Sequence, residues 1–392
     1  MATHIARSLT GVDASAWNAI PGAEAPFLRH EFLLALEQSG CATPATGWEA
    51  NHVLLHGPDG RLAGALPLFL KPHSWGEFVF DFAWADAYHR AGLHYYPRLV
   101  SAVPFTPATG PRLLAADDAL RSQLLAAARD RMRELGASSL HFLFPQGRDR
   151  EFLAAAGLIP RLDLQFHWRN EDYASFDEFL AGFTAEKRKK LKRERRRVAE
   201  AGIECRTLHG GELDETMIDT VYRLHAITFE RYGHAPYLNR DFFSRLARTL
   251  PDALVIELAT HRGEPVACAV SLRGQDALYG RYWGANGEYH SLHFELCYYR
   301  GIEYCIRERL SRFEPGTQGE HKLLRGFVPT PVWSMHEIAD ARFSAAIGDW
   351  LRRERKARRE WLREAVGHLP FRRDDIPARL GPDVRDCLAA ED

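Results

Sequence analysis

Apolar positions follow two kinds of spacing along this chain, and their order predicts its elements. Short apolar runs bounded by turn residues indicate strands, and longer stretches with apolar residues every three to four positions indicate helices. The runs 51–56 and 62–70 flank a Pro58-Asp59-Gly60 turn, which predicts a β-hairpin. The aromatic run 78–84 and the short run 99–103 are expected to be further strands.

The first half continues through a loop of breaker residues, 104–111, into an Ala- and Leu-rich helix over 118–135. An apolar strand at 138–144 follows, and its His141 is expected to be a core histidine. Residues 250–330 repeat the order of hairpin, strand, loop, helix and strand without detectable sequence identity. The repeat predicts an α/β fold with mixed sheets, built from two tandem copies of one unit.

The same patterns predict how the chain is divided. We expect an N-terminal domain, a basic helical connector, a C-terminal domain and a polar tail, with bounds 1–170, 171–205, 206–372 and 373–392. The connector carries nine Lys/Arg and three Glu between Thr184 and Gly202, on a helix with a thin apolar stripe. A solvated helix face and a phosphate-binding surface are both open interpretations of this segment.

Composition limits the class of protein. The chain has 392 residues, 46% of them hydrophobic, and a net charge of −1, so no global charge draws it to nucleic acid or a membrane. We identify no transmembrane segment and no signal peptide. None of the six cysteines forms a CxxC pair, which argues against a zinc site and favours a cytoplasmic enzyme with reduced thiols. No GxSxG elbow, P-loop or metal-ligand spacing is present.

The stretch 313–327 carries the densest candidate chemistry. Glu320, His321, Lys322 and Arg325 lie among three glycines directly after a short strand. Such a loop is where α/β enzymes place acids, bases and cations that hold anions. On a continuing strand, Glu320 and Lys322 would share one face and His321 the other. We expect Glu320 and His321 to be catalytic and Lys322 and Arg325 to bind substrate; the alternative is a salt-bridged turn.

Two other segments of the second half are candidates. His293 and Glu295 open an otherwise apolar helix, where charged groups need partners. We expect Glu295 to be catalytic and His293 to bind substrate, although a first-turn carboxylate also suits the helix dipole. Arg281 and Tyr282 lie in an aromatic strand. Arg281 is interpreted as a clamp for a substrate carboxylate or as a buried ion pair with Glu295 or Glu320.

In the first half, acids and aromatics gather around one tryptophan. Asp81 and Asp86 flank Trp84, and Tyr88 follows. Acids among aromatic rings are places where a carboxyl pKa rises toward the value a base needs. We therefore expect Asp86 to be catalytic and Asp81, Trp84 and Tyr88 to bind substrate. The alternative is that the two acids hydrogen-bond a tight turn.

Several of these segments resemble a known family. Residues 80–88, Tyr279–Gly284, Leu292–Tyr299 and Gln318–Lys322, with the basic helix 187–203, are similar to the bacterial FemAB-like proteins, which are described as peptidoglycan biosynthesis or recognition proteins of the GNAT superfamily. The resemblance covers about residues 10 to 372. It implies two tandem GNAT-like domains and an N-acyltransferase. The acceptor would be an amine on a cell-wall precursor, a peptide or a small metabolite.

The resemblance leaves the acyl donor open between acyl-CoA and an aminoacyl-tRNA, the donor of FemAB-type enzymes. The Q/R-x-x-G-x-G/A loop that holds a pyrophosphate in many GNAT enzymes is missing from both halves. Thr106, Thr109 and Gly110 occupy its place in the first half and are candidates for cofactor binding, as are Lys187 and Arg188. The segment 187–197 could hold tRNA, but near-neutral charge favours acyl-CoA. A non-catalytic peptidoglycan-precursor recognition module is the alternative function.

Overall fold

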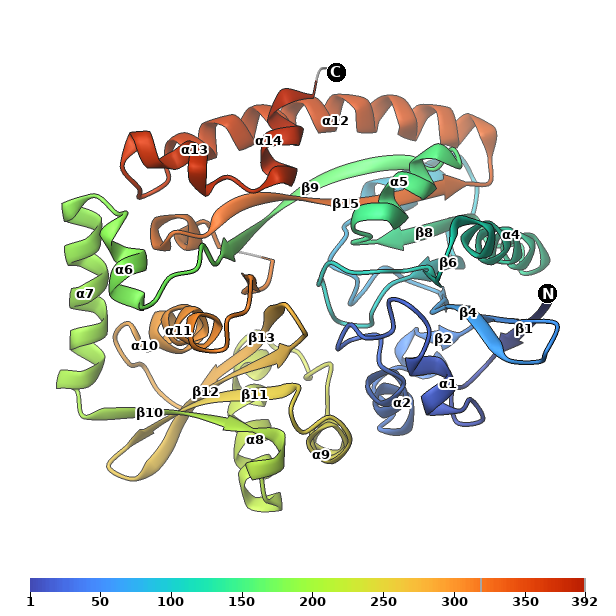
Figure 1. Cartoon of the computed structure of the whole chain (residues 1–392). Coiled ribbons are helices and arrows are strands. Elements are labelled where there is room, and N and C mark those ends of the chain that lie inside the picture. Colours follow the sequence, from blue (N-terminus) through green and yellow to red (C-terminus); the bar gives the residue numbers. More distant parts are fainter. Residues whose placement is uncertain (318, 391–392) are drawn as a thin grey trace. The chain divides into compact units, whose positions relative to one another are not determined.

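The chain folds into two compact units with α/β architecture (Figure 1). The computed structural model describes residues 1–317 and 319–390, so Gln318 of the candidate loop lies outside the described residues. Among the described residues, the first unit comprises 1–163 and 332–358, and the second comprises 164–331 and 359–390. This division differs from the expected one, because residues 332–358 return to the first unit. They do so because Ser334–Ile338 pair with Ser139–Leu143 as antiparallel strands.

The first unit contains two sheets. One is antiparallel and has the order β1 (Ala2–Ala6), β3 (His52–His56), β4 (Leu62–Leu66) and β7 (Leu114–Ala115). The other has the order β15 (Val328–Ile338), β8 (Ser139–Leu143), β6 (Arg98–Ser101), β5 (Phe69–Lys71) and β2 (Glu49–Ala50). Only β6 and β8 run parallel among the pairs of this sheet. The hairpin expected from the Pro58-Asp59-Gly60 turn is confirmed as β3 and β4.

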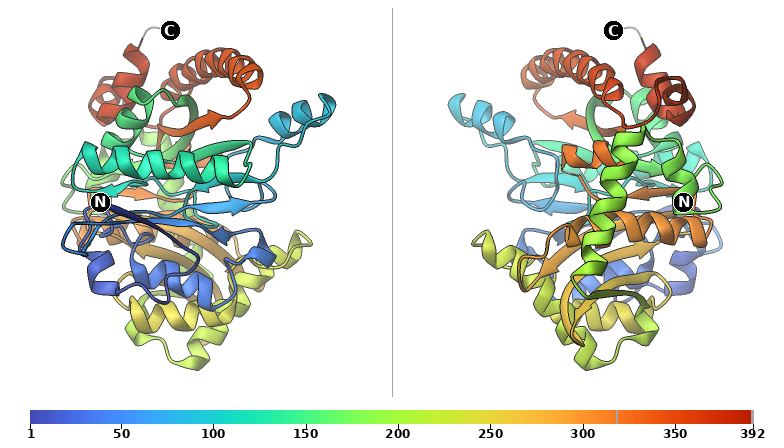
Figure 2. Two further views of the ribbon diagram at one scale, coloured as in Figure 1. Left: turned by 90° about the vertical axis from the view of Figure 1, so that its right-hand side faces the viewer. Right: turned by 90° about the vertical axis from the view of Figure 1, so that its left-hand side faces the viewer.

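Helices cover these sheets. Those of the first unit are α1 (Ala14–Asn18), α2 (His30–Gln38), α3 (Phe82–Arg90), α4 (Asp118–Glu134), α5 (Gly147–Ala155) and the start of α12 (Ala341–Gly367). The apolar face of α4, with Leu124 and Ala128, packs in one core with Leu66, Leu99 and Phe142 from the strands. Figure 2 shows α3 standing out from its sheet. The strand expected over 78–84 is wrong, because α3 begins at Phe82.

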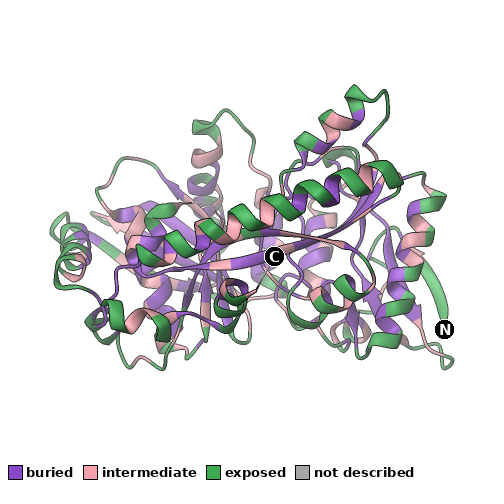
Figure 3. Ribbon diagram, turned by 90° about the horizontal axis from the view of Figure 1, so that it is seen from above, coloured by how far each residue is buried: buried purple, intermediate pink, exposed green. Residues whose placement is uncertain are grey.

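The second unit contains one mixed sheet. Its order is β10 (Ile203–His209), β11 (Leu254–His261), β12 (Glu264–Arg273), β13 (Ala277–Ala285), β14 (Arg312–Glu314) and β9 (Ile159–Arg169). Its helices are α6 (Phe176–Ala181), α7 (Ala185–Glu200), α8 (Glu215–Arg231), α9 (Arg240–Thr249), α10 (Leu292–Phe294), α11 (Arg300–Arg307), α13 (Ile376–Arg379) and α14 (Pro382–Ala389). Figure 3 shows buried residues concentrated along the strands and exposed ones along the outer sides of the helices.

The parallel strands β13 and β14 separate soon after they meet. They pair only from Ala277–Arg312 to Tyr279–Glu314, while β13 continues to Ala285. Helix α8 approaches β13 so closely that a Cβ at Gly284 would lie 1.7 Å from the carbonyl oxygen of Leu224. Glycine is therefore required at this position. The sheet opens beyond Tyr279 and Glu314.

The core of the first unit contains a pair of hydrogen-bonded histidines. His141 on β8 faces His336 on β15, with 2.6 Å between their Nδ1 atoms. Their Nε2 atoms lie 2.7 Å and 2.8 Å from the hydroxyl oxygens of Ser139 and Ser334. Burial lowers the pKa of both rings well below the usual histidine range. Both are thus neutral core histidines, as expected for His141.

We expect the free energy of unfolding to fall as the pH drops from about 6.5 to 5. In that range the unfolded chain binds protons at these two histidines that the folded chain does not bind. The stabilisation is fully present above the unfolded-state pKa of about 6.5. Below that pH, each histidine lowers the free energy of unfolding by up to about 1.4 kcal/mol per pH unit. Urea unfolding at several pH values measures the slope. A His141→Gln/His336→Gln variant should flatten it and an exposed His89→Ala control should not; an equal slope in all three proteins would contradict the argument.

None of the helices in the described parts of the chain combines the length and apolar character that crossing a bilayer requires.

Candidate functional site

A cavity of about 480 Å³ lies in the second unit where β13 and β14 separate. Its wall comes from β12, β13, the start of the helix that follows β13, and the loop and short helix after β14. Five of the expected site residues line it: Arg281, Tyr282, His293, His321 and Lys322. The structure thus brings together candidates from three separate sequence segments.

The helix that follows β13 changes its winding at this cavity. Between α10 and α11, residues Glu295–Tyr299 (η3) form a π-helix, in which the chain is wound more loosely than in an α-helix. Such insertions occur frequently at functional sites. His293, Cys297 and Tyr298 of this region reach the cavity, and Glu295 lines a different pocket of the same unit.

The loop after β14 enters a 3-10 helix, η4 (Glu320–Arg325), and not the continuing strand that we expected. Gly319, with φ +109°, and Gly326, with φ +84°, bound it in conformations that favour glycine. The expected alternation of faces is therefore wrong. His321 and Lys322 both line the cavity, whereas Glu320 is exposed and does not.

His321 forms a hydrogen-bonded pair with a tyrosine. Its Nε2 lies 2.7 Å from the hydroxyl oxygen of Tyr298. Partial burial, with the nearby charges of Arg325 and Lys322, lowers the pKa of His321, so the ring is neutral near pH 7. Burial raises the pKa of Tyr298, so its hydroxyl stays protonated. A neutral imidazole beside a protonated phenol can pass a proton in either direction.

Lys322 is buried in the cavity wall. Its exposed fraction is 2%, and its Nζ donates a 2.7 Å hydrogen bond to the carbonyl oxygen of Gly316. Burial lowers the pKa of Lys322 to about 7. Burial and the neighbouring cations also lower the pKa of His293 to about 4, and the His293 ring packs against Trp283, Tyr298 and His321. The cavity therefore holds nitrogen bases that are largely or partly unprotonated at neutral pH.

Arg281 and Tyr282 come from the part of β13 beyond its pairing with β14. The guanidinium of Arg281 lies 5.2 Å from the centre of the Tyr282 ring. Burial lowers the pKa of Arg281, and Tyr282 and Glu314 oppose that effect. Both side chains line the cavity wall, where a substrate-binding role is open to them.

Arg325 does not line the cavity. It is buried, donates to both carboxylate oxygens of Glu194 at 2.9 and 3.0 Å, and donates to the hydroxyl of Tyr299 at 3.0 Å. A further bond of 2.8 Å reaches the carbonyl oxygen of His321. Arg325 therefore holds the η4 backbone and is already neutralised, which leaves it poorly placed to clamp a substrate anion.

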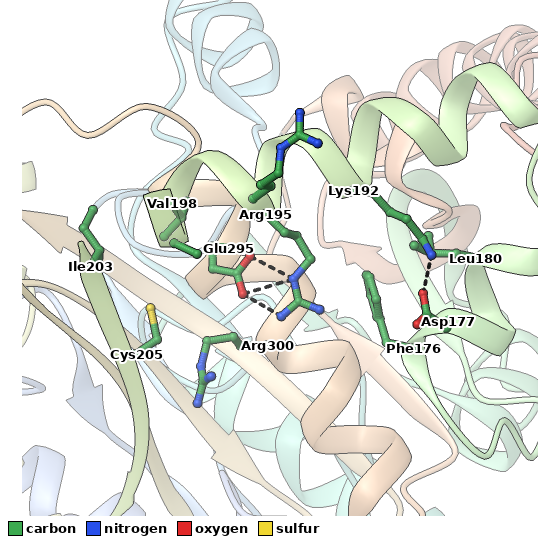
Figure 4. A pocket seen from close by; sticks show the side chains of 12 residues that line it. Phe176, Asp177, Leu180, Lys192, Arg195, Val198, Ile203, Cys205, Glu295 and Arg300 are labelled. Carbon is green, nitrogen blue, oxygen red and sulfur yellow. Dashed lines mark hydrogen bonds and ion pairs between the residues drawn. The ribbon is translucent and has the colours of Figure 1, made fainter. Parts of the chain in front are cut away.

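Glu295 is also engaged elsewhere. Its carboxylate accepts three bonds of 2.7 to 3.2 Å from Arg195 of α7, which also pairs with Glu303. Figure 4 shows this ion pair in a second pocket of the unit, with the Arg195 side chain between Glu295 and Phe176. Burial raises the pKa of Glu295, but the ion pair keeps it occupied. The arrangement ties α7 to the π-helical turn.

The first-unit candidates are not among the residues that line the cavity of the second unit. Asp86 is exposed and pairs with Arg90 at 2.8 Å, one turn along α3. Asp81 is buried, accepts a 2.7 Å bond from the hydroxyl of Tyr95 and lies 3.2 Å from Arg98. Trp84 packs on the histidine pair, and burial raises the pKa of Tyr88 to about 12. These contacts favour the structural interpretation of this cluster.

The loop expected to bind a cofactor in the first unit is closed. The buried guanidinium of Arg112 donates to the carbonyl oxygens of Ala108, Pro111 and Leu143. The amide of Gly110 donates to Phe144, and the hydroxyl of Thr106 donates to Pro104. Thr109, also expected to bind a cofactor, is half-buried in the same loop. Lys187 and Arg188 are half-buried near the start of α7 in the second unit, and they line neither of the two pockets described for that unit. The guanidinium of Arg112 is thus engaged by the backbone of the first unit itself.

Sequence reasoning missed Tyr298, Glu194 and Arg112. Tyr298 stood in a segment quoted for its family resemblance, but its pairing with His321 depends on the π-helical turn. Glu194 stood out only as one of three acids on a basic helix. Its partner Arg325 is 131 residues away. Among the described residues, no group of three or more metal-binding side chains is found.

The chain has a mixed α/β fold in two units, with a cavity in the second unit where two parallel strands separate. Over residues 8–373 the chain matches the FemAB-like family, described as peptidoglycan biosynthesis/recognition, and it belongs to that family. No curated protein shows significant sequence similarity to it.

Solved structures support the fold assignment. FemX is similar over 89% of this chain and 100% of its own, with a TM-score of 0.52 at 12% identity. A conserved protein of unknown function from Bacteroides thetaiotaomicron is similar over 86% and 99% of the two chains, with a TM-score of 0.51 at 11% identity. A tandem GNAT protein from the clavulanic acid biosynthesis pathway reaches a TM-score of 0.43 at 13% identity, over 86% and 98% of the two chains.

Proposed function

We propose that the protein is an acyltransferase that moves an acyl or aminoacyl group to an amine acceptor, with the reaction in the cavity of the second unit. One observation carries the proposal: the hydrogen-bonded pair of His321 and Tyr298 lies in a cavity formed where two parallel strands separate. The closed loop of the first unit supports placing the chemistry in the second unit.

The pair can move the proton that the reaction must transfer. In the tautomer with hydrogen on Nε2, His321 donates to the oxygen of Tyr298, and its Nδ1 can accept a proton. The amine nitrogen bonds to the acyl carbon and gives a proton to Nδ1. The Nε2 proton passes to the tyrosine oxygen, and the tyrosine hydroxyl proton goes to the leaving group as its bond to carbon breaks. The exposed His321 then regains its starting tautomer by exchange with water.

The donor in this proposal is a thioester such as acyl-CoA, or the ester of an aminoacyl-tRNA. The family description supports a cell-wall precursor or a peptide as the source of the amine. A cytoplasmic location belongs to the proposal, because both donors are found there. The exposed cations of α7, including Lys189, Lys190 and Arg193, are a candidate surface for tRNA.

A donor titration tests the proposal. We expect acetyl-CoA, a longer acyl-CoA or a charged tRNA to raise the unfolding temperature in a saturable way, since a ligand at 100 times its Kd adds about 2.7 kcal/mol to the folded state. A Gly280→Leu variant, which would place a side chain against Phe313 and Pro315 at the strand opening, should abolish the shift. An exposed Gly60→Asn variant is the control.

A recognition module is the second candidate, because the guanidinium of Arg112 bonds to the backbone of the first-unit loop that was expected to bind a cofactor. Binding of a peptidoglycan precursor without any response to thioesters or charged tRNA would replace the transferase proposal with that function.

A further inference from the structure

Lys322 has an environment that is unusual for a buried cation. Its side chain is almost fully buried, yet the one hydrogen bond of its ammonium group among the described residues goes to the carbonyl oxygen of Gly316. An ammonium group has three N–H donors, so two of them have no protein acceptor in the described parts of the chain. Buried charges in proteins are normally paired with an opposite charge. Lys322 therefore lacks the opposite charge that normally accompanies a buried ammonium group.

The rest of the cavity does not supply that partner. No aspartate or glutamate lines it among the described residues, and its ionisable lining groups are the bases Arg281, His293, His321 and Lys322 with the hydroxyl and thiol groups of nearby side chains. Glu314, on the adjacent strand, bonds to Arg312 at 3.1 Å and lies 3.9 Å from His167. The groups that face or influence Lys322 from the surrounding elements are Cys297, His293, His321, His167 and Arg281.

The other buried lysine of the chain shows what a completed site looks like. Lys71, in the first unit, is fully buried, lies 3.8 Å from a carboxylate oxygen of Glu77 and stacks over the ring of Trp48 at 3.6 Å. It also donates to the carbonyl oxygen of Trp75 at 3.1 Å. The same chain thus contains one buried lysine with a carboxylate close by and one without, and the second, Lys322, lines the cavity.

We propose that the cavity of the second unit binds its ligand through a negatively charged group, a carboxylate or a phosphate, that pairs with the ammonium of Lys322. This inference deepens the proposed function by naming the class of substrate. A carboxylate would come from an amino acid or peptide acceptor and a phosphate from a nucleotide-bearing donor.

The pairing has a proton-linked consequence. Without a ligand, burial holds the pKa of Lys322 near 7. A bound anion favours the charged form and raises that pKa, so binding takes up a proton whenever the free lysine is neutral. The apparent affinity for the anion should therefore fall about tenfold per pH unit above pH 7, until the pKa of the bound state is reached.

NMR of lysine-labelled protein tests the proposal directly, because the chain has only seven lysines. The full chain, labelled with ¹³C- and ¹⁵N-lysine, is titrated from pH 5 to 10 alone and with acetate, glycylglycine, inorganic phosphate or coenzyme A. The Lys322 signal is assigned by its loss in a Lys322→Met variant. We expect its titration midpoint to rise by at least one pH unit with one chemical class of anion. Lys71, observed in the same spectra, should titrate without responding to any probe.

The outcomes separate the possibilities. A response to the carboxylates identifies the acceptor as the source of the anion, and a response to phosphate or coenzyme A identifies the donor. Binding of the responding anion should weaken at least tenfold in Lys322→Met, which replaces an unpaired ammonium with an apolar chain of similar length. An unchanged midpoint with all four probes, or equal anion binding by the variant, would overturn the inference. An anion response without acyl transfer from any donor would refute the proposed function and leave this site intact.

Discussion

Replacing His321 with alanine should lower the turnover of acyl transfer by about 10²- to 10⁴-fold, the usual effect of removing a positioned general base. The variant loses the group that accepts the amine proton and the hydrogen bond to Tyr298. The ring is exposed at the cavity mouth, so the variant should fold as the parent does. Steady-state rates with a donor and acceptor identified by the titration above measure the effect.

The matched control for this substitution is His290→Ala, which removes an exposed histidine from the loop before α10. It should leave the turnover unchanged. Tyr298→Phe should also reduce turnover, and the double variant should be little worse than His321→Ala alone, since the two groups transfer the same proton. Additive losses in the double variant would show that the two residues act separately. Full activity of His321→Ala would exclude it as the base.

The sequence predicted much of the framework for this site. The hairpin of β3 and β4, the glycine-bearing loop after β14 and the repeated order of elements follow from local spacing and turn residues. These rules also located Arg281, His293, His321 and Lys322, because charged or basic residues stood out within apolar or glycine-rich segments. Local spacing was sufficient wherever the relevant contacts were close along the chain.

Local spacing failed where distant residues decide the structure. Residues 320–325 resembled the continuation of a strand, but two glycines and the bonds of Arg325 to Glu194 close them into a 3-10 helix. The aromatic run before Trp84 suggested a strand, although Trp84 and Tyr88 are spaced as in the helix they form. Glu295 was expected to be catalytic because it opens an otherwise apolar helix. Its partner Arg195 lies 100 residues earlier. The spacing of apolar and polar residues in the sequence does not reveal pairs between such distant residues.

Replacing Glu194 with glutamine should destabilise the protein by about 3 kcal/mol, because removing one member of a buried ion pair leaves the other uncompensated. Both partners are buried, and Glu194 accepts from Arg325 and from Tyr299. Urea unfolding measures the loss. The control is Glu200→Gln on the same helix, which removes an exposed ion pair with Arg196 and should change stability by less than about 0.5 kcal/mol.

Glu194→Gln should also change the pH dependence of the reaction, because Arg325 bonds to the backbone carbonyl of His321. Without Glu194 the positive charge of Arg325 is no longer balanced. Arg325 then disfavours the protonated form of His321 more strongly and lowers the pKa of His321 further. The acidic limb of the rate profile should then move to lower pH, a change that a purely structural loss would not produce. Adding Arg325→Met to Glu194→Gln removes both charges and should recover most of the stability. An unshifted pH profile with full destabilisation would confine Glu194 to holding the fold.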